Sequence, residues 1–537
     1  MTTVRDATLD VLRQCGMNRM FANPGSTEVP FLTDLPDDLE FVLGLHEGTV
    51  VGMATGYAIA AGKPALVVLH TTAGLGNAVG ALATARVNRA PLVVLVGQQD
   101  RRHLATEPFL AGRLQGLAGG YPVWEHQPVR PQDVPGAVRR AWHEAVQHRG
   151  PAIVVVPMDD WSAESDPALA SAGPVTLTRG RLEPGAAVDD VVRLLEEAES
   201  PVLIVGAGAD EPQTWAELVT LARGLGAPVW QEAFGARAGF PQDHPQFAGH
   251  LPSNRSGLRS VLAAHDVALV VGTGAFRQYA YEPGPLVADG VTVAVISDDP
   301  DELHHSHADV AVLADPAAAC AAIAARLRPR PFTAAPRPAP EVEPPRADDR
   351  LLATHVFAAL AQRLPRDTVL VEETPSSRPD LHRWLPARAP RGFVSAAMGG
   401  LGFALPAAAG LRLGDPSRPV VAVLGDGSSL YAVQGLWSAA RYACGVLYIV
   451  LNNGRYAIMD RLASDAGGKP PWPAFGEIDI TELARSLNCP ARRITSHTEL
   501  ISTFDDVLPA LSTRTEPLLL DISVATDEAA TQPGGTA

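Results

Sequence analysis

Lysine is almost absent from this sequence of 537 residues, which contains only Lys63 and Lys469. That scarcity leaves little material for Schiff-base chemistry, in which a lysine amine attacks a carbonyl carbon. The formal net charge is -16, and the chain lacks a basic cluster interleaved with aromatic side chains. We therefore expect no nucleic-acid partner.

Cysteines and long apolar runs are also scarce. The four cysteines, Cys15, Cys320, Cys444 and Cys489, are widely spaced and form no CxxC pair. We expect buried thiols in a reducing compartment, with neither disulfides nor zinc. No apolar run reaches transmembrane length, and the first residues lack a signal-peptide apolar region, so we expect a cytoplasmic protein without membrane contact.

The chain is too long for one hydrophobic core, and about three domains are expected. We predict domains at residues 1–165, 186–328 and 350–537. Residues 164–186 are rich in Ser, Ala, Pro and Gly, as in a connector. The density of proline in residues 329–349 predicts an extended linker.

Within each domain, short apolar runs alternate with stretches of helical spacing. This alternation predicts an α/β fold of three doubly wound parallel-sheet domains. The expected strands are residues 41–45, 65–70, 91–97 and 152–157 in the first domain, 201–208, 267–274, 291–297 and 310–314 in the second, and 368–373, 420–424, 447–451 and 517–523 in the third.

Two strands of the third domain end in oxygen-bearing residues. The run 420–424 is followed by Gly425-Asp426-Gly427-Ser428, and the run 447–451 by Asn452-Asn453-Gly454. Carboxyl ends of parallel strands meet at one edge of a sheet, where ligands bind. A carboxylate and a carboxamide oxygen suit Mg²⁺ or Ca²⁺, and a helix beginning after Gly427 favours an anion. The residues predict a metal-bridged diphosphate site.

Gly-Asp-Gly followed at this distance by Asn-Asn resembles the diphosphate motif of the thiamine diphosphate-dependent enzymes. The three α/β segments match the pyrimidine-binding, central and diphosphate-binding domains of that family. A bare Gly-Asp-Gly could also be a hairpin turn, so the spacing and flanking strands carry the resemblance.

Three residues of the first domain are the expected catalytic groups. Glu47 follows the run 41–45, His70 ends the run 65–70, and Ser26 lies in Asn-Pro-Gly-Ser-Thr-Glu. Taken alone, Glu47 could be a first-turn charge of a helix, His70 a structural histidine, and Ser26 part of a turn and helix cap. A histidine that titrates near neutral pH is nevertheless a natural acid-base group.

Together these motifs resemble the benzoylformate decarboxylases within the same family. The resemblance covers nearly the whole chain and includes Asn-Pro-Gly-Ser, His-Glu-Gly, Leu-His-Thr-Thr-Ala-Gly, Gly-Gln-Gln, Pro-Met-Asp-Asp-Trp and Gly-Gly-Leu-Gly-Phe-Ala-Leu-Pro. It implies that Ser26 binds the substrate carboxylate, that His70 acts in acid-base steps, and that Glu47 activates the cofactor through its pyrimidine ring.

The resemblance also implies the residues that bind the cofactor, thiamine diphosphate with Mg²⁺ (or Ca²⁺). The metal would be held by Asp426, Asn453 and the carbonyl of Arg455. The cofactor would contact Glu47, Ser376, the Gly399 carbonyl, Leu401 as an apolar wedge, Gly425, Gly427, Ser428 and Tyr456.

The sequence departs from this pattern in the expected substrate pocket. Tyr279 stands where these decarboxylases carry a second histidine, and tyrosine, with a reference pKa of about 10, is a poor proton shuttle at neutral pH. Ile458 and Leu462 replace an alanine and a phenylalanine, and Pro375 replaces a threonine near the diphosphate. These changes reshape the space for an aryl ring, so the acyl group need not be phenyl.

Two further patterns have simpler interpretations. Val205-Gly206-Ala207-Gly208 follows a strand, as in a nucleotide-binding turn, but lacks a third glycine and a ribose-binding acid. We expect no dinucleotide there.

A run of histidines, His304-His305-Ser306-His307, suggests a metal site. The acidic residues at 298–302 beside it favour a solvated loop instead.

The expected function is thiamine diphosphate- and Mg²⁺-dependent, non-oxidative decarboxylation of a benzoylformate-like 2-oxo acid to an aldehyde and CO₂. A carboligase or acyloin lyase of the same family is the alternative that Tyr279 raises. A thiamine diphosphate-binding protein with little catalysis is a third. Because the family forms its active site between the first domain of one subunit and the third domain of another, we expect a homo-oligomer, a dimer of dimers.

Overall fold

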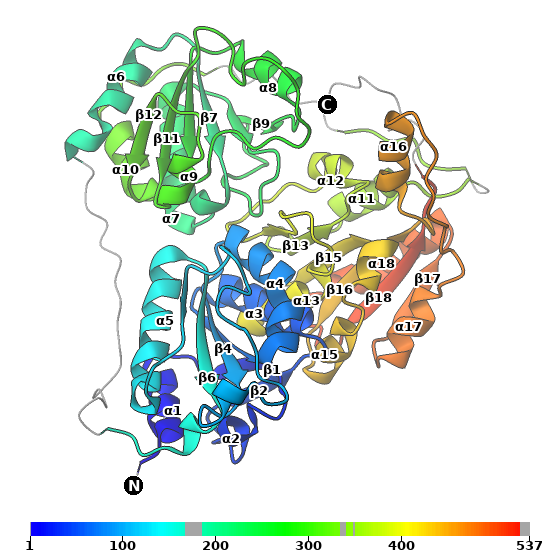
Figure 1. The fold of residues 1–537 in the computed structure, drawn as a ribbon. Helices are drawn as coiled ribbons and strands as arrows, with labels where there is room; N and C mark the ends of the chain where they lie inside the picture. Colours follow the sequence, from blue (N-terminus) through cyan, green and yellow to red (C-terminus); the bar gives the residue numbers. More distant parts are fainter. Residues whose placement is uncertain (1, 167–184, 333–339, 347–348, 527–537) are drawn as a thin grey trace.

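The computed structural model describes residues 2–166, 185–332, 340–346 and 349–526. Within them, three six-stranded sheets follow one another along the chain, and all neighbouring strands pair in parallel. Helices flank each sheet (Figure 1). The prediction of an α/β fold with three parallel-sheet domains is confirmed.

The first sheet has the strand order β2-β1-β3-β4-β6-β5. Its inner strands are almost completely buried, which explains their near-continuous apolar sequences. Its strands are β1 (Arg19–Asn23), β2 (Glu40–Leu43), β3 (Ala65–His70), β4 (Leu92–Gln98), β5 (Trp124–His126) and β6 (Pro151–Pro157). Its helices are α1 (Val4–Gln14), α2 (Val29–Leu32), α3 (Glu47–Ala61), α4 (Thr71–Val87) and α5 (Val134–His148).

The third sheet repeats the strand order of the first, as β14-β13-β15-β16-β18-β17. Its strands are β13 (Val369–Glu373), β14 (Phe393–Ser395), β15 (Val420–Gly425), β16 (Val446–Asn452), β17 (Ala491–Ile494) and β18 (Leu518–Ser523). Its helices are α11 (Ala353–Ala361), α12 (Arg378–Trp384), α13 (Ala404–Gly414), α14 (Asp426–Leu430), α15 (Gly435–Arg441), α16 (Ala457–Asp465), α17 (Ile480–Ser486) and α18 (His497–Val507). In both sheets the strand order reverses between the first and third strands, and ligand crevices form at such switch points.

The central sheet has a different order, β12-β11-β10-β7-β8-β9, and its switch point lies between β7 and β10. Its strands are β7 (Pro201–Val205), β8 (Val229–Gln231), β9 (Phe247–His250), β10 (Val267–Val271), β11 (Thr292–Ser297) and β12 (Val310–Leu313). Its helices are α6 (Asp189–Glu197), α7 (Pro212–Leu225), α8 (Arg255–Leu262), α9 (Pro300–His304) and α10 (Pro316–Ala324).

The predicted strands fall on observed ones, with two differences. The strands expected at 201–208 and 267–274 end earlier, at Val205 and Val271, because the chain turns at the glycines that follow. Six strands were not predicted: β1, β5, β8, β9, β14 and β17. Most of the expected connector at 164–186 lies outside the described residues, and the described part of 329–349 carries no helix or strand.

The first and third domains pack closely through α3 and α13. A side chain at Gly56 would overlap the Ala407 carbonyl, and one at Gly410 would overlap the Met53 carbonyl. Apolar residues of both domains form one continuous core that includes Met53 and Ala407. Glycine at these positions therefore allows the two helix backbones to approach.

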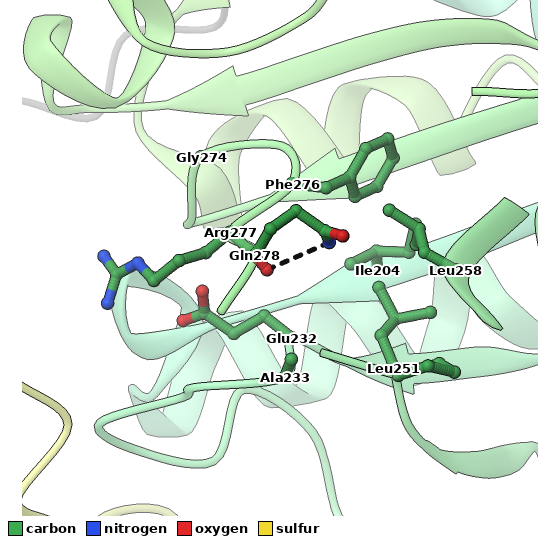
Figure 2. A pocket seen from close by; sticks show the side chains of 10 residues that line it. Ile204, Glu232, Ala233, Leu251, Leu258, Gly274, Phe276, Arg277 and Gln278 are labelled. Carbon is green, nitrogen blue, oxygen red and sulfur yellow. Dashed lines mark hydrogen bonds between the residues drawn. The ribbon is translucent and has the colours of Figure 1, made fainter. Parts of the chain in front are cut away.

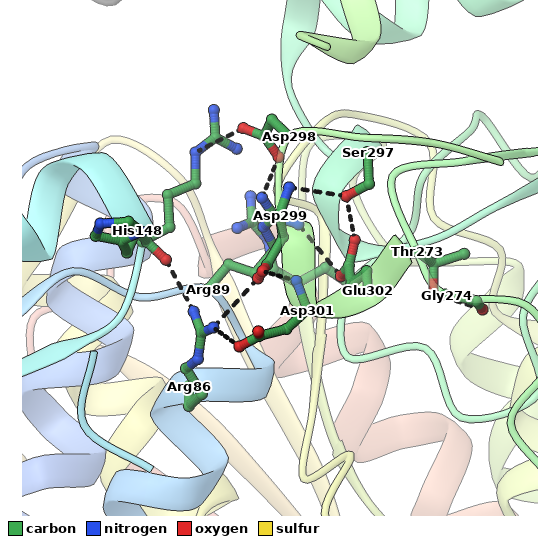
Figure 3. A network of polar contacts seen from close by, with 12 residues as sticks. Arg86, Arg89, His148, Thr273, Gly274, Ser297, Asp298, Asp299, Asp301 and Glu302 are labelled. Atoms are coloured by element: carbon green, nitrogen blue, oxygen red, sulfur yellow. Dashed lines mark hydrogen bonds and ion pairs between the residues drawn. The ribbon is translucent and has the colours of Figure 1, made fainter. Parts of the chain in front are cut away.

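His304, His305 and His307 are exposed, as expected for a solvated segment, but the neighbouring acidic residues 298–302 contact arginines of the first domain (Figure 3). Asp298 pairs with Arg89, whose side chain is only 6% exposed, and Glu302 lies 3.2 Å from the same guanidinium. Arg86 lies 3.3 Å from both Asp299 and Asp301. These arginines belong to the first domain, so the acidic segment forms an interdomain contact. The sequence did not indicate this contact, because the arginines lie about 200 positions away along the chain.

The four cysteines are buried free thiols, as predicted. Among the described residues, no helix is long and apolar enough to cross a membrane.

Candidate active site

The switch point of the first sheet brings two predicted residues to one edge. Ser26 follows β1 and is exposed, and His70 ends β3. The His70 Nδ1 atom lies 3.0 Å from Thr27 Oγ1 and 3.0 Å from a carboxylate oxygen of Glu28. Glu28 is buried and also accepts hydrogen bonds from the Gly25 N–H and the Thr27 hydroxyl. A carboxylate in this position fixes the orientation of the imidazole ring.

Two glycines leave the space that this group of side chains needs. A side chain at Gly25 would overlap the His70 ring, and a side chain at Gly97 would overlap the Glu28 carboxylate. Gly25 and Gly97 both belong to motifs that were recognised in the sequence. Glu28 was regarded only as part of a turn and helix cap. Its position in the Asn-Pro-Gly-Ser-Thr-Glu turn was the available signal, because a residue in such a turn faces the same sheet edge as Ser26.

Glu47 opens α3 directly after β2 and is 8% exposed. Its two carboxylate oxygens accept hydrogen bonds from the side-chain amides of Asn23, at 3.2 Å, and Asn77, at 3.0 Å. Neither asparagine was singled out as a functional residue. The amides fix the carboxylate at the same sheet edge as Ser26 and His70, since Asn23 ends β1 and Asn77 lies on α4.

In the third domain, Asp426 follows β15 and is almost completely buried. One carboxylate oxygen accepts from the Gly427 N–H at 2.7 Å, and the other from the backbone N–H groups of Asn453, at 3.0 Å, and Gly454, at 2.5 Å. The Asn453 side-chain oxygen accepts from the Arg455 N–H at 3.1 Å. The structure therefore brings the predicted metal ligands together across β15 and β16.

The other predicted cofactor residues lie near the ends of neighbouring strands of the third sheet. Ser376 follows β13, and Gly399 and Leu401 lie between β14 and α13. Ser428 lies in α14, and Tyr456 precedes α16 and packs against Phe475. A side chain at Gly427 would overlap the Tyr456 ring, so this glycine permits a close approach. Gly399 has a φ of 72°, a conformation that favours glycine.

These residues fit a bound diphosphate and a divalent cation. Burial raises the pKa of Asp426, so a carboxylate in this place gains stability from a cation. A side chain at Gly399 or Gly400 would meet nothing within 4 Å, which leaves open space beside the predicted aminopyrimidine contact. Among the described residues, no group of three or more His, Cys, Asp and Glu side chains could hold a metal ion, so a cation at Asp426 would depend on amide, backbone and ligand oxygens.

The predicted pocket residues lie on two different domains. Ile458 and Leu462 are on α16 and are partly exposed. Tyr279 is on a loop of the central domain and is 68% exposed. Its N–H donates to the Ser253 carbonyl at 2.9 Å, and its ring lies 6.4 Å from that of Phe234. Within one chain, Tyr279 therefore contacts central-domain residues.

The glycine turn of the central domain is filled by protein side chains. Glu232 is buried beside it, accepts a hydrogen bond from Thr273 Oγ1 at 2.7 Å, and interacts with the Ala207 N–H. Figure 2 shows Glu232 at the edge of a small cavity that Gly274 also lines. On the other side, a side chain at Gly208 would lie only 2.7 Å from the Arg89 guanidinium. A carboxylate and a guanidinium thus lie against this glycine turn.

Comparison with known families finds three matches along the chain. Residues 2–117 match the N-terminal thiamine pyrophosphate-binding domain of thiamine pyrophosphate enzymes. Residues 188–323 match the central domain of these enzymes, and residues 376–522 match their C-terminal thiamine pyrophosphate-binding domain.

Individual relatives match over nearly their full length. The chain is 34% identical to a benzoylformate decarboxylase from Pseudomonas aeruginosa, over 98% of this chain and 100% of the relative. A structure of the Rhodococcus jostii thiamine diphosphate-dependent 4-hydroxybenzoylformate decarboxylase superposes with a TM-score of 0.91 at 34% identity, over 98% of this chain and 99% of the other. The crystal structure of a benzoylformate decarboxylase from Polynucleobacter necessarius gives 0.92 at 31%, with the same coverage of both chains.

Proposed function

The chain belongs to the thiamine pyrophosphate enzyme family, and from this premise we propose that it decarboxylates a benzoylformate-like 2-oxo acid to an aldehyde and CO₂ without net oxidation. The single observation that carries the proposal is the contact between His70 and Glu28 at the switch point of the first sheet, with Ser26 exposed in the same turn as Glu28. An oriented imidazole at the sheet edge that also carries an exposed hydroxyl suits a substrate with a carboxylate next to a carbonyl.

We assign the cofactor to the strand ends already described. Thiamine diphosphate, when bound, supplies the nucleophilic carbon and the electron sink that decarboxylation requires. Asp426, Asn453 and the Arg455 carbonyl would hold Mg²⁺. Further contacts to the cofactor would come from Ser376, Gly399, Leu401, Gly425, Gly427, Ser428 and Tyr456.

The remaining roles belong to protein side chains of the first domain. Glu47 would hold a proton at the pyrimidine ring nitrogen, with Asn23 and Asn77 fixing the orientation of its carboxylate. Ser26 would orient the substrate carboxylate. His70 would donate and accept the protons of the carbonyl oxygen and the product, with Glu28 holding its ring.

The site is proposed to be completed by a second copy of the chain. Large apolar side chains next to the assigned residues are exposed, in particular Val29, Leu45, Met398 and Tyr431. Exposed apolar side chains around a catalytic edge are typical of a surface that a partner covers. A homodimer, assembled further into a tetramer, would bring the first domain of one subunit to the third domain of another.

A second candidate function is carboligation to a 2-hydroxy ketone, and Tyr279 favours it. A tyrosine is a weaker proton source than the histidine found there in the decarboxylases that the chain resembles, so release of aldehyde would be slower and an added aldehyde could be captured. Product analysis with an aldehyde acceptor distinguishes the two: only free aldehyde and CO₂ would exclude carboligation.

The mechanism is tested by replacing Glu47 with Gln. The variant keeps the side-chain shape and can still accept hydrogen bonds, but it cannot ionise. We expect turnover to be lost while thiamine diphosphate still binds, as measured by isothermal titration calorimetry. Unchanged turnover in the variant would refute the assigned role.

The third possibility, a thiamine diphosphate-binding protein with little catalysis, would be supported if wild type binds the cofactor but turns over none of a broad 2-oxo acid panel.

A further inference from the structure

Two adjacent glutamates at the end of β13 are almost completely buried, at 0% exposure for Glu372 and 1% for Glu373. Consecutive side chains of a strand point to opposite faces, so each serves a different set of partners. Glu373 accepts hydrogen bonds from the N–H groups of the three residues 402–404, at 2.6 to 2.9 Å. The sequence analysis assigned a role to neither glutamate.

Glu372 joins two separate segments of the chain. One carboxylate oxygen accepts from the Thr374 N–H at 2.6 Å and from the Thr374 hydroxyl at 3.1 Å. The other accepts from the Ser395 hydroxyl at 2.8 Å and lies 2.9 Å from Nε of Arg378. Arg378 in turn donates to Ser395 Oγ at 3.2 Å.

Both segments lead to residues assigned to the cofactor. Thr374 begins the turn after β13 that contains Ser376, the proposed diphosphate contact. Ser395 ends β14 and begins the segment that leads to Gly399, the proposed aminopyrimidine contact. A single carboxylate therefore fixes the start of both segments.

Stability alone does not account for an ion pair between the completely buried Glu372 and the partly exposed Arg378. Replacing a buried carboxylate and guanidinium with apolar side chains is often neutral or stabilising, because desolvation offsets much of the attraction. An apolar pair, however, could not accept hydrogen bonds from Thr374 and Ser395 at once. The polar contacts set the geometry of the two segments, which is a requirement of a binding site.

We propose that Glu372 is a positioning residue of the cofactor site, which holds the Ser376 turn and the Gly399 segment in the relative position that thiamine diphosphate binds. This inference rests on the proposed function, because it assumes that these segments face the cofactor.

The test is the dissociation constant of thiamine diphosphate in the presence of Mg²⁺, measured by calorimetry on the full-length protein. Glu372→Gln keeps the size of the side chain but removes the charge that binds Arg378. We expect the dissociation constant to rise about 10- to 100-fold, the usual effect of losing a residue that orients ligand-binding groups. The matched control is Asp160→Asn, which removes a carboxylate that is completely buried, like that of Glu372, and is paired with Arg101 in the first domain.

The control separates positioning from general destabilisation. Asp160→Asn should lower the unfolding temperature but leave the dissociation constant unchanged within about twofold. If the role of Glu372 is purely structural, Glu372→Gln should behave in the same way, with a lower unfolding temperature and an unchanged dissociation constant. If Glu372→Gln does not fold, Ser395→Ala serves instead, because it removes the hydroxyl that links the second segment to Glu372. We expect a smaller rise, of about three- to tenfold, from this loss of one hydrogen bond.

The outcomes distinguish the two proposals. Wild-type protein that binds no thiamine diphosphate would overturn the proposed function and this inference together. Wild-type binding with an equal dissociation constant in the folded Glu372→Gln variant would overturn the positioning role and leave the proposed function intact. A raised dissociation constant in Glu372→Gln, with an unchanged value in Asp160→Asn, would support the positioning role.

Discussion

The Nδ1 atom of His70 lies 3.0 Å from a carboxylate oxygen of Glu28, although the two residues are 42 positions apart. The contact joins the turn after β1 to the end of β3, across the switch point of the first sheet. A buried carboxylate at this distance fixes the orientation of the imidazole ring. The proposed acid-base group is therefore a pair of residues.

The first prediction concerns Glu28. Glu28→Gln should lower kcat by about tenfold or more, because part of the acid-base contribution of His70 depends on its partner. Gly97→Ala should have a similar effect, since the added methyl group would displace the Glu28 carboxylate. Steady-state kinetics at saturating cofactor provides the measurement, and calorimetry should find cofactor affinity unchanged. A wild-type kcat in both Glu28→Gln and Gly97→Ala would show that the acid-base role of His70 does not require the Glu28 carboxylate.

The second prediction concerns Tyr279. Tyr279→His should speed aldehyde release and lower the yield of 2-hydroxy ketone when an acceptor aldehyde is added, because histidine exchanges protons more readily near neutral pH. Tyr281→His is the matched control, since Tyr281 is an exposed tyrosine two positions away. An identical product ratio in the wild type and both variants would mean that position 279 does not determine the fate of the reaction.

The third prediction concerns the metal. Asp426→Asn should abolish Mg²⁺-dependent binding of thiamine diphosphate, whereas Asp465→Asn, which changes an exposed carboxylate at the end of α16, should not. Burial raises the pKa of Asp426, so in wild type a falling pH should weaken Mg²⁺ binding sooner than expected for an ordinary aspartate. Titrations with Mg²⁺ at several pH values measure this. Cofactor binding by Asp426→Asn that still depends on Mg²⁺ would rule out Asp426 as the ligand.

The fourth prediction concerns stability and pH. Burial raises the pKa of Glu373 to about 7. The folded state then binds the proton more tightly than the unfolded state, so the contribution of Glu373 to stability is full below the ordinary carboxyl pKa and decreases as pH rises toward 7. Between pH 5.5 and 8 the loss amounts to about 2 kcal/mol.

Glu373→Gln cannot titrate and should therefore show a smaller decrease in unfolding temperature over this pH range than wild type. The other carboxylates are present in both proteins, so their contribution to the pH dependence of the unfolding temperature cancels in the comparison. Differential scanning calorimetry at the two pH values gives the difference, and parallel pH dependences would contradict a raised pKa at Glu373.

The sequence was sufficient to predict the fold class and most of the buried strands. Long apolar runs such as Leu92–Gln98 admit few alternatives, because only a strand covered on both faces suits them. Short or mixed strands were missed. Arg19–Asn23 lies inside the first sheet but has only three apolar residues, and Phe393–Ser395 has two. Their positions depend on pairing with distant strands, which one sequence does not contain.

Site residues that belong to recognisable motifs were predicted, whereas residues whose role depends on contacts distant in sequence were missed. The expected membership of the thiamine diphosphate-dependent enzymes is confirmed, and the assigned roles of Glu47, His70 and Asp426 remain proposals. Glu28 and Glu372 were not assigned functions, because their importance lies in contacts with His70 and Ser395, which are distant in sequence. The contact between the acidic residues 298–302 and the first domain was missed for the same reason.

The most direct test of the proposed decarboxylation is to incubate the purified protein with thiamine diphosphate, Mg²⁺ and benzoylformate, and to quantify CO₂ and the organic product together. Glu47→Gln under the same conditions is the control. We expect CO₂ and aldehyde in equal amounts from wild type and neither from the variant. The same assay on other 2-oxo acids should rank the acyl groups that Ile458 and Leu462 admit. Wild-type protein that binds the cofactor but releases no CO₂ from benzoylformate or from any other 2-oxo acid tested would contradict the proposed decarboxylation.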